Sequence, residues 1–205
     1  WVELRGKAPK KNPEKVQRAV EIVKKRSGLK LKEFKKAKDI LKYAPGVFDV
    51  LNEAYANLYG YQQLTAKQID YYVEQYFGFV KKEFVCIIVN EQDEVVGFAL
   101  TLPSLSKAFQ KAKGYLYPFG FIHVLSSFYF NKLADLFLIG VKPEYQRVGA
   151  HALIFDQLQK IYGKKGIEYM ASGPMLEDNN HVLNTWSEFD LDIGKIKRSC
   201  FIKHF

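Results

Sequence analysis

The chain has 205 residues, a formal net charge of +9 at pH 7, and 48% hydrophobic against 26% charged residues. This balance is that of an ordinary globular domain with a sizeable core, and it excludes a disordered or fibrous chain. No apolar run approaches the ~18 residues of a membrane span and no signal peptide is visible, so we expect a cytoplasmic protein.

Cysteine and histidine usage gives no sign of a metal site. Cys86 and Cys200 lie in apolar, strand-like runs, and the four histidines show no metal-ligand spacing. We expect both thiols to be buried in the core, which suits a reducing compartment.

The positive charge is spread over residues 7–11, 24–38 and 195–203. It is consistent with a phosphate-rich cofactor, a nucleic acid or an acidic neighbouring domain, but its spread favours a solvated basic surface. A nucleic-acid-binding module ranks last, because no motif of that kind is present.

The N-terminal part predicts a leading segment and a helix. Residues 1–11 are extended, Asn12 is a candidate N-cap, Pro13 fits the first helical position and Gly28 ends the helix. Residues 29–34 then predict a strand. We therefore divide the chain into residues 1–28, a leading segment and helix, and residues 29–205, the main domain.

Two helical regions and a hairpin follow. Residues 39–59 have a helical pattern broken at Pro45, and Thr65 with Gln68 resembles a capping box that opens a further helix. Residues 84–90 and 95–102 are β-rich runs separated by four polar residues, which predicts a β-hairpin.

Residues 114–130 are unusually aromatic, with seven aromatic side chains among seventeen residues. Such a stretch is a packed lid, a contact surface for an upstream region, or the floor of an acceptor pocket. Core packing or interdomain contact is the favoured interpretation. A membrane surface is not favoured, because no clear amphipathic stripe is visible.

The central unit is a strand, a loop and a helix. Residues 136–141 are an apolar run that ends before Pro143, and a helical face with Ala150 and Ile154 follows Gly149. The first turn of such a helix has unpaired N–H groups and a partial positive charge, so residues 146–151 are a candidate anion cradle. Units of this kind without any ligand are equally common.

The remaining elements complete a mixed sheet. Residues 166–172 predict a strand, a helix carrying Trp186 follows, and residues 195–205 alternate as a final strand with one basic face. The pattern predicts an α/β (α+β) domain whose mixed, mostly antiparallel sheet of about six strands is flanked by helices on both faces.

Residues 141–150 resemble the acetyl-CoA-binding motif of the GNAT superfamily of N-acetyltransferases, summarised as Q/R-x-x-G-x-G/A after a strand ending Val-x-Pro. Gln146 and Gly149 match the motif, whereas His151 stands where Gly or Ala is usual. Residues 102–108, 114–121, 176–179 and 197–203 further resemble the C-terminal GNAT-like domain of longer, uncharacterised bacterial proteins. In those proteins an upstream GNAT-like domain precedes this one.

The resemblance implies an acetyl-CoA-dependent N-acetyltransferase that acts on a small-molecule or peptide amine. It assigns Asp135 and Glu177 as candidate general bases. It assigns the following residues to acetyl-CoA: Ile139, Gly140, Val141, Gln146, Arg147, Val148, Gly149, Ala150, His151 and Asn179. Backbone N–H groups in residues 139–141 would polarise the thioester carbonyl.

Two further readings stay open beside the enzyme. Trp186 stands where many relatives have the tyrosine that protonates the leaving thiolate, and an indole is not a practical acid. Together with His151 this favours the alternative of a catalytically silent CoA-binding or structural module that supports an upstream domain. The other alternative is an enzyme of the same fold that uses a different group donor in place of acetyl-CoA, as in aminoacyl-transferring relatives.

The resemblance also implies that the two helices after the first strand form a wall of the acceptor site. Five tyrosines make this region aromatic, and packing in the core is the favoured interpretation for most of them. These are Tyr55, Tyr59, Tyr61, Tyr71 and Tyr72.

Overall fold

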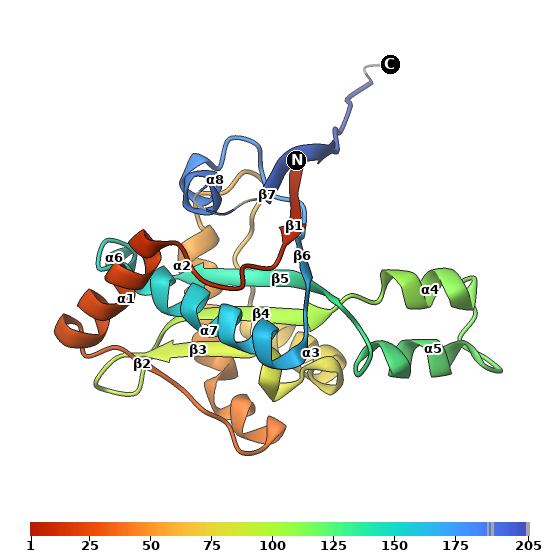
Figure 1. Ribbon diagram of the computed structural model, residues 1–205, viewed down its shortest axis with the longest axis horizontal. Coiled ribbons are helices and arrows are strands. Elements are labelled where there is room, and N and C mark those ends of the chain that lie inside the picture. The colour runs from red at the N-terminus through yellow and green to blue at the C-terminus, as the bar shows by residue number, and fades with distance from the viewer. Residues whose placement is uncertain (188, 190, 204–205) are drawn as a thin grey trace.

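The computed structural model describes residues 1–187, 189 and 191–203. A seven-stranded sheet runs through the molecule in the order β2-β3-β4-β5-β6-β1-β7 (Figure 1). Its strands are β1 (Val2–Lys7), β2 (Lys30–Leu31), β3 (Val85–Val89), β4 (Val95–Pro103), β5 (Leu133–Val141), β6 (Tyr169–Ser172) and β7 (Leu191–Lys197).

Helices follow most of the strands. The α-helices are α1 (Glu14–Arg26), α2 (Ala44–Tyr55), α3 (Ala66–Tyr76), α4 (Ser106–Ala112), α5 (Gly120–Ser127), α6 (Pro143–Gln146), α7 (Ala150–Lys165) and α8 (Asn180–Trp186). The short 3₁₀ helices are η1 (Ala37–Tyr43), η2 (Phe77–Phe79) and η3 (Lys82–Phe84). None of the helices in the described part of the chain is long and apolar enough to cross a membrane.

The sheet is antiparallel except where β5 runs parallel to β6. The parallel pair requires a crossover, and α6 and α7 supply it between these two strands. The fold class inferred from the sequence, a mixed and mostly antiparallel sheet flanked by helices, is confirmed.

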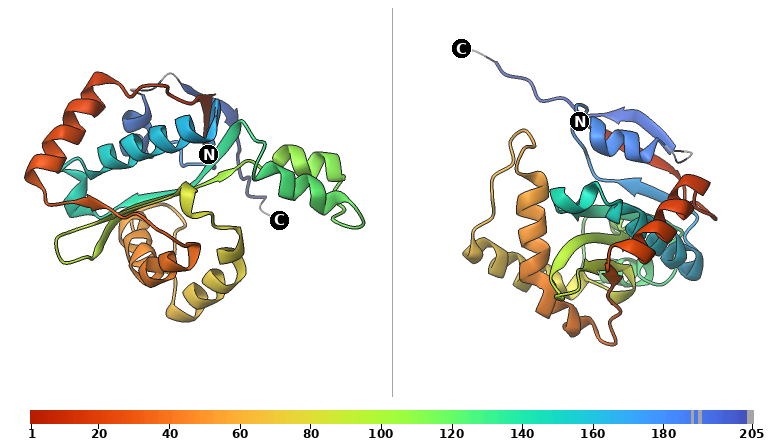
Figure 2. Two further views of the ribbon diagram at one scale, coloured as in Figure 1. Left: turned by 60° about the horizontal axis from the view of Figure 1, so that its bottom comes forward. Right: turned by 90° about the vertical axis from the view of Figure 1, so that its left-hand side faces the viewer.

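Two hydrophobic cores lie on opposite faces of the sheet. On one face α1 and α7 pack against each other and against the strands, with Ile154 and Leu153 almost fully buried. On the other face α2 covers β4 and β5, with Val50 and Phe98 in its core (Figure 2). Because burial of apolar area is the main stabilising term in folding, these two layers fix the position of β5 between them.

Several local expectations are confirmed. Thr65 caps α3 with its hydroxyl and Gln68 completes the capping box. The β3–β4 hairpin forms, and Asp93 in its turn adopts a left-handed conformation at φ 64°. The predicted N-cap Asn12 is instead buried one residue before the cap, since α1 begins at Glu14 after Pro13.

The C-terminal end differs from the expectation. The last strand spans Leu191–Lys197, because its partner β1 begins at Val2, which pairs with Lys197, and no further strand is left to pair. Cys200 therefore lies beyond the sheet and is exposed, so the prediction that it is buried was wrong, whereas Cys86 is buried as expected. Residues 204–205 of the predicted strand lie outside the described residues.

Candidate functional site

The parallel strands β5 and β6 diverge in the middle of the sheet. Their pairing ends at Leu136 and Ser172, and the chain after β6 turns to β1, where Met175 bridges to Val2. β5 nevertheless continues to Val141, paired with β4 alone among the described residues. One edge of residues 137–141 is thus left open within the sheet.

A β-bulge marks the point where the strands separate. Leu138 pairs with Leu100 and Leu136 with Thr101, so Phe137 is an extra residue on β5. Its side chain is 60% exposed. The bulge changes the direction of β5 at the point where β6 leaves it.

The open edge presents backbone N–H groups. Lys142 donates its N–H to Val96 on β4 at 2.9 Å, and because antiparallel bonds alternate, the polar groups of Ile139 and Val141 face away from β4. Side chains bind both outward carbonyl oxygens: Tyr55 donates its hydroxyl to Ile139 at 3.0 Å, and Gln146 donates its amide to Val141 at 2.9 Å. The edge is therefore equipped to bind a ligand's carbonyl oxygens.

A loop that contains α6 joins the open edge to the N-terminus of α7. Gly149 is the N-cap at φ 83° and ψ 23°, and no side chain caps the helix. This left-handed conformation favours glycine, because a Cβ atom would be strained there. The first-turn N–H groups of a 16-residue helix are thus free of a side-chain cap and carry the positive end of its dipole.

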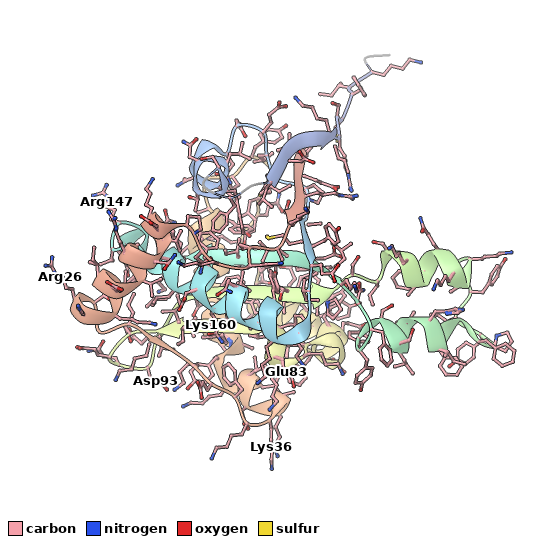
Figure 3. All side chains as sticks on the ribbon, in the orientation of Figure 1. Arg26, Lys36, Glu83, Asp93, Arg147 and Lys160 are labelled. Atoms are coloured by element: carbon pink, nitrogen blue, oxygen red, sulfur yellow. The ribbon has the colours of Figure 1, made fainter. Side chains whose placement is uncertain are left out.

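The other predicted cradle residues have different surroundings. Gln146 is half-buried and fixes the loop to Val141, while Arg147 and Val148 are exposed. Figure 3 shows Arg147 and Arg26 projecting from the same end of the molecule. A cationic side chain beside an uncapped helix N-terminus adds to the attraction of an anion.

At the start of α7 the chain is anchored in the core. Ala150 is fully buried, which fixes the helix end against α1. His151 is half-buried and its ring packs edge-to-face against Phe155 at 6.1 Å. Gly140 has a packing role: a Cβ atom there would lie 2.9 Å from the ring of Phe98.

Comparison with known proteins adds to this geometry. No protein-family model and no curated protein matches the sequence. Among solved structures, a GCN5-related N-acetyltransferase from Sphaerobacter thermophilus aligns over 94% of this chain and 47% of that protein, with 13% identity and a TM-score of 0.54. The present chain thus spans about half of that protein's length.

The chain has the GNAT fold. PH1933 from Pyrococcus horikoshii OT3 aligns over 84% of this chain and 92% of that one, at 18% identity and a TM-score of 0.53. The aminoglycoside acetyltransferase meta-AAC0020 from a soil metagenome, solved with sisomicin, aligns over 89% and 96%, at 14% identity and a TM-score of 0.51.

Within this GNAT fold, Asp135 lies in the closed part of the β5–β6 pair. It pairs with Ala171, which also faces Arg5 on β1, so Asp135 and Arg5 lie on one face of the sheet. Desolvation raises the pKa of the Asp135 carboxyl, and this effect exceeds the opposing ones of a hydrogen bond from Ser104 and the charge of Arg5. A partly buried carboxylate of raised pKa is a stronger base than a solvated one.

Glu177, the other candidate base, is exposed and ion-paired. Its carboxylate lies 2.5 Å from the ammonium group of Lys197. This hydrogen bond lowers the pKa of Glu177, which makes it a weaker base. The two candidates therefore differ in both basicity and environment.

Asn179 and Trp186 have structural partners at opposite ends of α8. Asn179 caps this helix, and its side-chain oxygen accepts from Val182 N–H at 3.4 Å. Trp186 is 3% exposed and packs on Phe155, with ring centroids 4.8 Å apart. Trp186 is therefore a core residue.

The contact of Tyr55 with β5 could not be predicted from the sequence pattern, which favours core packing for this side chain. Tyr55 and Tyr61 are half-buried, with ring centroids 5.6 Å apart. Tyr59, Tyr71 and Tyr72 are exposed, which contradicts core packing for those three. Burial raises the pKa of Tyr55 despite the opposing bond to Ile139, so its hydroxyl stays protonated at neutral pH.

Other hollows lie away from this site. A surface hollow of about 490 Å³ is lined by side chains of η1 and of the segment that joins β2 to it, among them Lys32, Lys42 and Tyr43. Asp93 binds both lysines and accepts from the Tyr43 hydroxyl, so the cationic groups there are largely compensated. The described residues contain no cluster of His, Cys, Asp and Glu that could hold a metal ion.

Proposed function

We propose that this chain binds acetyl-CoA and transfers its acetyl group to an amine. The observation that carries the proposal is the open edge of β5 at residues 137–141, which a loop containing α6 joins to the uncapped N-terminus of α7. An elongated ligand with carbonyl groups along its length and phosphates at one end matches this order of donors. The GNAT fold supports the same assignment.

The fit extends to the individual residues. N–H groups of Ile139 and Val141 would bind carbonyl oxygens of the pantetheine arm, and those of Ala150 and His151 would bind phosphate. The N–H of Gly149 is donated to the carbonyl oxygen of Gln146 at 3.0 Å, so Gly149 contributes space and backbone conformation. A Cβ atom added at Gly149 would have only one heavy atom within 4 Å, a side-chain carbon of Val23 at 3.5 Å. The phosphate side of the loop is therefore uncrowded. Arg147 and Val148 would border the cradle, and Asn179 would approach the arm from α8.

Acetyl-CoA supplies an activated thioester whose carbonyl carbon an amine nitrogen attacks, with the sulfur leaving as a thiolate. The free-edge N–H groups would stabilise the negative charge that develops on the carbonyl oxygen. Asp135 would accept the amine proton, directly or through water, and Glu177 is the weaker candidate. Since Trp186 is no acid, we assign protonation of the thiolate to the Tyr55 hydroxyl.

The second candidate is a CoA-binding or structural module without turnover, paired with an upstream GNAT-like domain. The burial of Trp186 against Phe155 favours it, because this position supplies no proton donor. Under this proposal the cradle binds CoA and no acetyl transfer follows.

Calorimetric titration with acetyl-CoA and with CoA, at low and moderate salt, tests the proposal. We expect micromolar binding that survives added salt, because backbone N–H groups contribute alongside charge. Acetyl transfer to a panel of amines, including aminoglycosides and diamines, then separates the enzyme from the silent module. Binding that vanishes with salt would overturn both.

A further inference from the structure

A helical arm projects from the sheet at the start of β5. Residues 104–132, here named the aromatic arm, contain α4 and α5, which pack against each other and extend away from the other layers (Figure 1). At its base Asn131 donates to the carbonyl oxygen of Ser104. The arm is therefore a folded hairpin of helices.

The two helices place small residues inside and large ones outside. Ala108, Ala112 and Gly120 are buried between them, and a Cβ atom at Gly120 would collide with the carbonyl oxygen of Tyr115 at 1.8 Å. Of the 21 exposed large hydrophobic side chains in the described part of the chain, ten lie between Phe109 and Phe130. An ordinary pair of surface helices buries its large apolar side chains and exposes polar ones, so the arrangement in this arm is the reverse.

The exposed face of α5 is a continuous apolar stripe. Phe121, Ile122 and Leu125 are 41%, 50% and 56% exposed, and their spacing puts them on one side of the helix. The turn before α5 adds Tyr117 and Phe119, which are 83% and 70% exposed. This stripe could not be recognised until the helix was bounded at Gly120–Ser127.

The charge of the arm is entirely positive. Lys107, Lys111 and Lys113 are exposed on α4 and at its C-cap, and no Asp or Glu occurs between Glu94 and Asp135. A second copy is a poor partner for this surface, because both arms and both chains carry net positive charge. The arm instead complements a partner surface that has an apolar interior and anionic groups at its boundary with water.

We propose that the aromatic arm docks onto an anionic lipid surface. The stripe of α5 would enter the boundary of headgroups and acyl chains, where Tyr and Phe are favoured, and the lysines of α4 would contact lipid phosphates. β5 has nine residues and so spans ~30 Å, with the arm at one end and the cradle at the other. A docked arm leaves the cradle open to water-soluble acetyl-CoA.

Vesicle flotation with the 205-residue protein tests this docking. The probes are vesicles of phosphatidylcholine alone and of phosphatidylcholine with phosphatidylglycerol. We expect flotation with the anionic vesicles, and at least about tenfold weaker partitioning for Leu125→Glu, which adds a charge to the exposed stripe that would enter the lipid surface. The matched control is Ile22→Glu on α1, where the side chain is 53% exposed, and it should float like the wild type.

Charge is tested separately with Lys107→Gln combined with Lys111→Gln, which should weaken binding to anionic vesicles. The control pair Lys25→Gln with Lys67→Gln removes the same charge from α1 and α3. Thermal unfolding of every variant checks that the fold is retained.

Three results would overturn the proposal. The first is absence of flotation by the wild-type protein. The second is equal loss for Leu125→Glu and Ile22→Glu, or binding that Leu125→Glu leaves intact, because a general basic surface would then be responsible. The third is a wild-type dimer in sedimentation that Leu125→Glu converts to a monomer without any vesicle binding, which would assign the stripe to a second copy.

Discussion

The Tyr55 hydroxyl, from the last turn of α2, donates to the carbonyl oxygen of Ile139 at 3.0 Å. This bond joins the helix to the open edge of β5 at a position that no strand of the described chain covers. The protonated hydroxyl of Tyr55 therefore lies beside the open edge of β5, where we place the pantetheine arm.

Replacing Tyr55 with Phe separates two effects. We expect the affinity for CoA to stay within about twofold, because the ligand is placed on the N–H groups of the edge whereas Tyr55 occupies a carbonyl oxygen. Acetyl transfer should slow by at least about tenfold, because the proton donor is gone. Calorimetry measures the affinity for CoA and single-turnover kinetics measure acetyl transfer. The control is Tyr61→Phe, because the Tyr61 hydroxyl binds Asn52 and not β5. Unchanged transfer by Tyr55→Phe would refute the acid role.

Gly149 gives the sharpest test of the cradle. Gly149→Glu puts a carboxylate at the proposed phosphate site and should weaken CoA binding by at least about tenfold, or 1.4 kcal/mol. Gly166→Glu at the other end of α7 is the control, because it imposes a similar left-handed strain at φ 67° against φ 83°. Equal CoA affinity of the two variants would remove the phosphate site from the N-terminus of α7.

Asp135 should make stability depend on pH in a defined direction. Its pKa is raised above the ordinary 3.8, so the folded chain holds this proton more tightly than the unfolded chain. The carboxyl's contribution to stability is therefore present at low pH and lost as the pH rises through the folded-state pKa. Asp135→Asn should gain stability relative to wild type between about pH 3 and 7, measured by thermal unfolding. A relative loss over that range would show that Ser104 and Arg5 favour the ionised form.

The two carboxylates should also differ in catalysis. Asp135→Asn should lower acetyl transfer by about a hundredfold or more and remove the acidic limb of its pH profile. Glu177→Gln should leave the rate within about twofold, because its ion pair with Lys197 is exposed and lowers the pKa of Glu177. The opposite ranking in a steady-state assay would exchange their roles.

Trp186 is expected to matter for stability and not for chemistry. Trp186→Ala should cost about 3–5 kcal/mol of unfolding free energy, because it empties the space against Phe155 and Phe189. Trp186→Phe should retain most of both stability and any turnover. Loss of turnover in a stable Trp186→Phe protein would show a direct role, which denaturant unfolding and kinetics together reveal.

The sequence by itself determined the elements that depend on local pattern. The apolar run of β5, the glycine before α7, the β3–β4 hairpin and the Thr65 capping box depend on residues close together in the chain, and each lies where the pattern predicts it. The mixed sheet followed from the order of these elements.

Only the tertiary structure decided which groups meet across the sheet. β5 and β6 separate after Leu136 and Ser172, and the chain beyond β6 pairs with β1 through Met175 and Val2. The contact of Tyr55 with Ile139 joins residues 84 positions apart. The C-terminal strand ends at Lys197 because its partner β1 begins at Val2, which pairs with Lys197, and the stripe on α5 faces outward because small residues fill the space beside α4. Local periodicity carries no information about such partners, since each depends on packing between distant segments.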